Sequence, residues 1–90
     1  MSDPLPVRYH LEMYVGSLLN DPFFSTTGSS PFLTISVGDT FDWRGFRDFP
    51  ETVPADSVLK VSEVQHIIWE IEGSHISHKL MPVVEIAKLD

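Results

Sequence analysis

Four histidines are the side chains of this chain best suited to chemistry, because imidazole titrates near neutral pH and binds metal ions. His75 and His78 stand three residues apart in the segment GSHISHK. On a helix this spacing would put both rings on one face, whereas on a strand it puts them on opposite faces. The flanking residues favour strands, so we do not expect a shared metal. His10 and His66 become the candidates for a metal-dependent hydrolase if their strands pair.

Serines and carboxylates offer no further catalytic pattern. None of the serines, among them Ser25, Ser29, Ser30 and Ser36, lies in a GxSxG elbow, and the chain has no phosphate-binding loop. Glu70 and Glu72 share the polar face of a predicted strand, where solvation accounts for them. The sequence contains no cysteine, which removes thiol nucleophiles and Cys-type metal ligands. It therefore predicts a protein that is not an enzyme and that holds no cofactor or metal.

A β-hairpin is predicted from Leu59 to Lys88. Two runs of β-forming residues flank Glu72–His75, and Gly73 suits the first central position of a two-residue type II′ turn. A loop of Gly73 and Ser74 would place Trp69 opposite His78. The apolar face of the hairpin, and hence part of the core, would then consist of Ile67, Trp69, Ile71, Ile76 and Leu80.

Both arms of this hairpin should contain an irregularity. The alternation breaks near Ser62 and Glu63, which predicts a β-bulge there. Pro82 lies late in the second arm and has no N–H to donate. We therefore expect that arm to be a sheet edge at Pro82, or to bend and change partner.

The rest of the chain predicts short strands between long loops. Val7 to Val15 alternates without a break, which indicates a strand. The other segments are a loose lead-in at 1–6, a loop at 17–31, a strand at 32–37, a short strand at 41–43 and a loop at 44–58. Residues 1–90 thus form a single, mainly β domain with four or five strands, two long loops and little helix.

Free sheet edges are costly, so we expect closure into a small antiparallel barrel or a strongly bent sheet, with an open sheet as the alternative. The bend ISVGDTF, from Ile35 to Phe41, and the hairpin from Leu59 to Ile86 resemble short, uncharacterised bacterial or phage proteins of the SH3-like or Sm-like small β-barrel type. This resemblance implies the fold and assigns no functional residue.

The charge and the hydropathy of the chain limit the classes of partner that it can bind. Thirteen acidic residues against six basic ones give a net charge of −7, which opposes binding to nucleic-acid phosphates. No apolar run approaches the roughly 20 residues of a membrane span. The N-terminus lacks the basic and apolar regions of a signal peptide. A cytoplasmic protein with neither a nucleic-acid nor a membrane partner is the expectation.

Aromatic residues in the two long loops are the strongest hint of a binding surface. They either cap a thin barrel or form an apolar patch that anchors a protein partner. In the second interpretation nearby carboxylates form a polar rim. The predicted contact residues are Phe23, Phe24, Trp43, Phe46 and Phe49, with Asp42, Asp48 and Glu51 as the rim.

The sequence thus predicts a non-catalytic protein–protein interaction module, acting as an adaptor, accessory subunit or inhibitor. A homodimer that pairs through an edge strand of the hairpin is one form of this function. The alternatives are a small-barrel nucleic-acid-binding protein and a small metal-dependent hydrolase.

Overall fold

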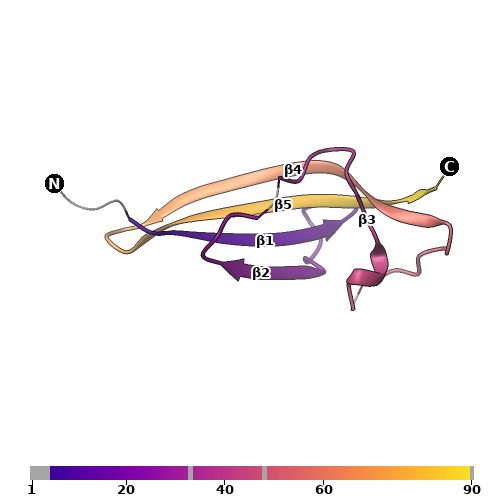
Figure 1. Cartoon of the computed structure of the whole chain (residues 1–90), viewed down its shortest axis with the longest axis horizontal. Coiled ribbons are helices and arrows are strands. Elements are labelled where there is room, and N and C mark those ends of the chain that lie inside the picture. Colours follow the sequence, from indigo (N-terminus) through magenta and orange to yellow (C-terminus); the bar gives the residue numbers. More distant parts are fainter. Residues whose placement is uncertain (1–4, 33, 48, 90) are drawn as a thin grey trace.

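The protein is mainly β and forms one five-stranded mixed sheet that curls into a half-barrel (Figure 1). The computed structural model describes residues 5–32, 34–47 and 49–89. The sheet order is β2-β1-β5-β4-β3. The elements are β1 (Val7–Val15), β2 (Phe24–Gly28), β3 (Thr40–Phe41), the 3-10 turn η1 (Trp43–Gly45), β4 (Ser57–Ile71) and β5 (His75–Lys88). The predicted strongly bent sheet with little helix is confirmed.

The central strand is β5, which lies between β1 and β4. β1 runs parallel to β5, from the pair Val7 and Ile76 to the pair Val15 and Val84. The other three strand pairs are antiparallel. A parallel pair needs a long crossover connection, and the chain supplies one because β2, β3 and β4 all lie between β1 and β5 in the sequence.

The first strand is confirmed, and the second is displaced from its predicted position. β2 forms from Phe24–Gly28, inside the segment expected to be a loop, and pairs antiparallel with β1. The strand predicted at 32–37 is wrong for its described residues, while Leu33 lies outside them. Phe32 and Ile35 instead pack on the core, and the Ser36 N–H donates to the Asp39 carboxylate at 2.8 Å.

The hairpin exists, but the predicted register is wrong by one residue. The loop has three residues, so Trp69 pairs with Ser77 and Ile68 pairs with His78. The Ser74 N–H donates to the Ile71 carbonyl at 2.9 Å, and Gly73 has φ +73°. A positive φ at the third position is the type II arrangement.

This shift changes the core as well. A one-residue slip moves side chains to the other face of a strand, so Ile67, Trp69 and Ile71 leave the face that carries Ile76 and Leu80. Ile67 is 46% exposed and Ile71 is 43% exposed. The predicted core list for the hairpin is therefore wrong for Ile67 and Ile71, whereas Leu80 packs against the core of the covered face.

Of the two irregularities predicted for β4 and β5, one is confirmed and the other is wrong. The register shifts between Val61 and Glu63, which confirms the bulge. Pro82 is buried in the central strand, opposite Val64, so the expectation of a sheet edge there is wrong. The ladder from β5 to β1 skips the region of Pro82, since it runs to Leu80 and resumes at Val83. The missing N–H of proline accounts for this gap.

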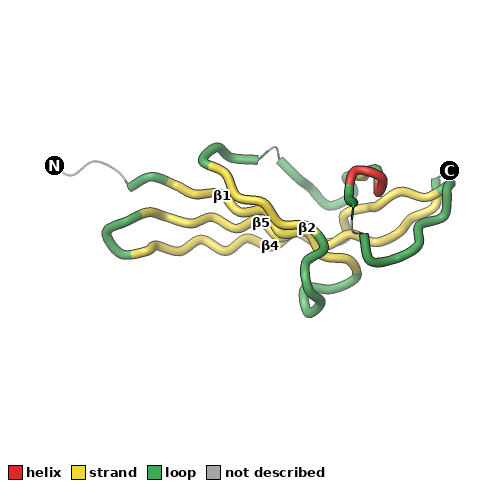
Figure 2. Tube along the Cα trace, turned by 90° about the horizontal axis from the view of Figure 1, so that it is seen from below, coloured by secondary structure: helices red, strands yellow, loops and turns green. Residues whose placement is uncertain are grey.

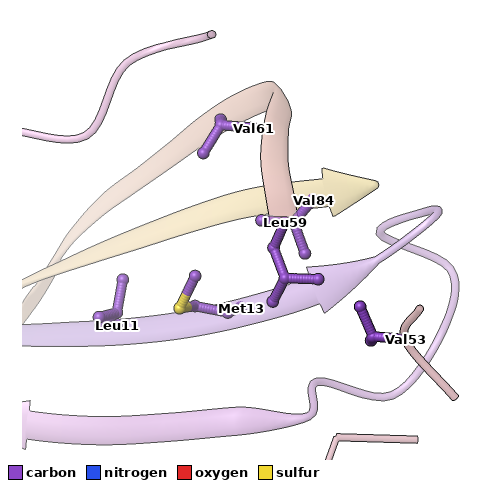
Figure 3. Close-up of a cluster of buried hydrophobic side chains, with 6 residues drawn as sticks. All are labelled: Leu11, Met13, Val53, Leu59, Val61 and Val84. Carbon is purple, nitrogen blue, oxygen red and sulfur yellow. The ribbon is translucent and has the colours of Figure 1, made fainter. Parts of the chain in front are cut away.

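Two small cores lie on the two faces of the sheet. On the first, which we name the covered face, loop residues pack over the strands, and Val53 from the loop before β4 joins buried residues of three strands (Figure 3). These are Leu11, Met13, Leu59, Val61 and Val84. On the other side, which we name the open face, the buried residues are Tyr14, Met81 and Val83, with Leu18 packed against them.

The molecule is elongated, with extents of 55 × 22 × 20 Å. The turn between β4 and β5 lies at one end, and the loops around η1 lie toward the other (Figures 1 and 2). No helix in the described part of the chain is long and apolar enough to cross a membrane.

Candidate interaction surface

The loop phenylalanines come together in one cluster, although they belong to two loops far apart in the sequence. The ring of Phe23 meets Phe46 and Phe49 edge-to-face, with centroids 5.1 and 4.9 Å apart. Phe24 and Phe41 also contact Phe46, at 5.4 and 6.5 Å. All five rings are partly buried against the core of the covered face. This packing fits the capping interpretation, and a role as partner contacts stays a prediction.

The remaining predicted contacts lie around η1. Trp43 also packs against the core, and with Asp42 and Arg44 it lines a cavity of about 410 Å³. Asp42 caps η1 and forms an ion pair with Arg44 at 2.6 Å. The hydrogen bond from the Arg44 side chain lowers the pKa of Asp42 to about 2. Glu51 is exposed, and Asp48 lies outside the described residues.

The outer edge of β4 is where the structure leaves backbone groups without a strand partner. Toward the end of the chain, β3 pairs with Leu59 and Lys60, and Val61 exchanges backbone hydrogen bonds with Gly38 and Asp39. Beyond the bulge, within the described part of the chain, no strand pairs with this side of β4. We name the segment Gln65–Ile71 the free edge.

The alternation of the ladder shows which groups this edge presents. The bond from Ser74 places the carbonyl of Ile71 on the β5 side. In an antiparallel pair, successive residues turn their N–H and C=O alternately toward and away from the partner. His66, Ile68 and Glu70 therefore present theirs to the outside.

The side chains of the free edge are apolar and exposed on both faces of the sheet. Ile68, on the covered face, is 68% exposed. On the open face Ile67 and Ile71 flank Trp69, which is half-buried. The Trp69 ring stacks on His10 with centroids 5.9 Å apart, and the Lys79 ammonium lies 5.8 Å from its centroid. The indole is thus held in place while its isoleucine neighbours remain accessible.

Two histidines meet beside this edge, on the covered face. His66 Nδ1 and His78 Nε2 are 2.9 Å apart, and the ring centroids are 5.2 Å apart. A cavity of about 200 Å³ adjoins them, lined also by Tyr9, Phe32 and Ile35. The facing nitrogens lie on the line between the ring centres, which is the geometry of a hydrogen bond. A chelating pair would instead aim its lone pairs at a common third point.

The structure gives a separate outcome for each predicted pair of histidines. His75 and His78 lie on opposite faces, as strand alternation predicted, despite the error in register. His10 and His66 belong to strands that do not pair, since β5 lies between them. Among the described residues, no group of three or more histidines and carboxylates is placed to hold a metal.

A charged cluster on the open face fixes β1 to β5. Lys79 Nζ lies 3.1 Å from the Glu12 carboxylate, and the Tyr14 hydroxyl donates to the same oxygen at 3.0 Å. Burial raises the pKa of Glu12, but the hydrogen bonds from Lys79 and Tyr14 outweigh it, so the pKa falls below its ordinary 4.5. Burial and the bond to Glu12 raise the pKa of Tyr14.

Sequence reasoning missed the free edge because it assigned Ile67 and Ile71 to the core. A signal for it was present. Exposed edge strands usually carry lysine or proline, which discourage pairing with another chain. The segment QHIIWEI contains neither.

Compared with protein-family models, with curated proteins and with solved structures, the chain matches none. The geometry of the free edge is therefore the basis on which a function can be proposed.

Proposed function

We propose that this protein is a non-catalytic protein–protein interaction module, which acts as an adaptor, accessory subunit or inhibitor. It binds its partner by adding a strand of that partner to the free edge of β4. The observation that supports this proposal is the free edge itself: on the outer side of its seven residues no strand of the described chain pairs with β4, and Ile68 is 68% exposed. Strand addition supplies affinity through backbone hydrogen bonds and specificity through alternate side chains.

The side chains around the edge suit this role. Trp69 is held by His10 and Lys79, so it offers a large apolar surface whose orientation is already fixed. Aromatic residues in such settings are common energetic centres of protein interfaces. Ile67 and Ile71 extend the apolar surface along the open face.

The acidic surface has a second, weaker role in the proposal. The net charge of −7 disfavours encounter with nucleic acid. Asp42 and Glu51 are exposed and contribute to this charge.

The test is affinity purification from native lysate, followed by mass spectrometry, with matched variants. Ile68→Lys places a charge at the centre of the free edge. Leu19→Lys places the same charge at a residue that is 96% exposed and lies outside the sheet. We expect Leu19→Lys to retain the proteins captured by the wild type and Ile68→Lys to lose them. Equal capture by the two variants would contradict binding at this edge.

A further inference from the structure

We propose that the free edge binds the free edge of a second copy of this chain. The two strands pair antiparallel about a two-fold axis at Ile68, so that the two sheets join into one. This inference rests on the proposed function, because it names the partner that the edge takes.

The backbone of the free edge suits pairing with itself. Antiparallel strands related by a two-fold axis bring each residue opposite a residue of the same parity when the axis passes through a residue. His66, Ile68 and Glu70 all turn their N–H and C=O groups outward. With the axis at Ile68, outward groups of one copy therefore meet outward groups of the other along the whole segment.

The side chains match in the same register. His66 lies opposite Glu70 of the second copy, which pairs a hydrogen-bonding imidazole with a carboxylate. Ile67 lies opposite Trp69 of the second copy, which pairs a β-branched residue with an aromatic one. Such cross-strand pairs stabilise antiparallel sheets. Each pair occurs twice because of the symmetry.

Neighbouring registers are worse. An axis at Trp69 would put Ile68 opposite Glu70 of the second copy, and an axis at Glu70 would place two carboxylates opposite each other. An axis at Ile67 would put Glu63 opposite Ile71. Like charges directly opposite each other destabilise a sheet. Of these four registers, only the axis at Ile68 places Glu70 opposite a side chain that can hydrogen-bond to it, and only the axis at Glu70 places like charges opposite each other. The axis at Ile68 is therefore favoured.

The pairing also accounts for the apolar surface. On the open face, Ile67, Trp69 and Ile71 of one copy would continue into the same three residues of the other. On the covered face the two copies of Ile68, each 68% exposed in the single chain, would meet at the axis. The other sheet edge, β2, is shorter and exposes Ser25, Thr26 and Thr27, so it offers no comparable surface.

The first measurement is the molecular mass in solution by analytical ultracentrifugation, at about 100 μM protein, where a micromolar dimer would be mostly associated. We expect a dimer for the wild type and for Leu19→Lys. Ile68→Lys would bring two ammonium groups together at the axis, so we expect a monomer. Its circular dichroism should match the wild type, because Ile68 is largely exposed.

The second measurement tests the register by disulfide formation. The chain has no cysteine, so a single introduced cysteine can form a disulfide only between copies. In Ile68→Cys, the two Cα atoms across the axis would lie about 5.5 Å apart, within reach of a disulfide. In Glu70→Cys, they would be separated by four residues along the strand, or roughly 13 Å, which is out of reach. We expect at least tenfold faster covalent dimer formation for Ile68→Cys under mild oxidation.

The outcomes separate this inference from the proposed function. A monomeric wild type, a dimeric Ile68→Lys, or equal rates for the two cysteine variants would overturn the self-pairing. If the chain is monomeric but captures another protein that Ile68→Lys loses, the proposed function stands and the second copy is excluded as the partner. A monomer without any partner that depends on Ile68 would remove both.

Discussion

Phe46→Ala tests whether the loop aromatics are structural caps. The Phe46 ring contacts Phe23, Phe24 and Phe41 edge-to-face and packs on the core of the covered face. Truncation of a buried phenylalanine to alanine costs about 3–5 kcal/mol, and this ring is only partly buried. Loss of its aromatic pairs adds to the cost of lost burial. We therefore expect a loss of about 3 kcal/mol in the free energy of unfolding.

That loss is large for a chain of this size. A domain of 90 residues has a total stability of about 5–13 kcal/mol, at roughly 0.05–0.15 kcal/mol per residue. At 4–8 °C per kcal/mol, the midpoint of thermal unfolding should fall by about 12–24 °C. Urea unfolding followed by tryptophan fluorescence gives the free energy directly, with Trp43 and Trp69 as reporters. All variants must be compared at one protein concentration, because self-pairing would make stability concentration-dependent.

The matched control is Leu19→Ala, at a residue that is 96% exposed. We expect it to stay within about 0.5 kcal/mol of the wild type. If Phe46→Ala behaves like this control, the ring does not stabilise the fold. The cap interpretation would then be wrong, and the aromatic loops would become the better candidate for a partner surface.

Two further predictions concern one ion pair and one turn residue. Lys79→Gln should lower the free energy of unfolding at pH 7 by about 0.5–1 kcal/mol, the scale of a partly exposed ion pair. Because folding depresses the pKa of Glu12, the contribution of this pair is present above pH 4.5 and is lost as the pH falls through the folded pKa. The difference between variant and wild type should therefore shrink in acid, and a difference independent of pH would contradict this assignment. Gly73→Ala should lower the free energy of unfolding by about 1 kcal/mol. The positive φ is the only source of this cost, since a Cβ at this position would meet no atom within 4 Å. An unchanged urea midpoint would show that the turn is not held at that φ.

The sequence predicted those features of the fold that depend on strand alternation. Val7–Val15 was correctly identified from its period of two, and so was the placement of His75 and His78 on opposite faces. Neither conclusion depends on how strands pair. The predicted core of the hairpin does depend on strand pairing. Its assignment of Ile67 and Ile71 was wrong because the loop has three residues instead of the expected two. The length of one turn thus decided whether Ile67 and Ile71 were buried.

The second strand shows a different limit. Phe24–Gly28 is polar and contains a glycine, and it becomes a strand because β1 offers it an edge. The more apolar segment after Pro31 packs Phe32 and Ile35 on the covered face and forms no strand among its described residues. Local β-propensity is outweighed in both cases by tertiary contacts. The free edge could not be predicted for the same reason, since it is defined by which of the described strands lie beside β4.

The exposure of the isoleucines supports the proposal that the free edge binds a partner strand. Full burial of an isoleucine stabilises a protein by about 1.5–3 kcal/mol, and Ile67, Ile68 and Ile71 are 43–68% exposed. A short chain with a thin core has a small free energy of unfolding. The stabilisation that the three exposed isoleucines do not provide is therefore a substantial fraction of that free energy. An edge that served only as surface would be expected to carry lysine or proline instead. In the proposed pairing Glu70 lies opposite His66, whereas in the shifted registers it lies opposite an apolar side chain or another Glu70, so Glu70 favours one register of an otherwise apolar edge.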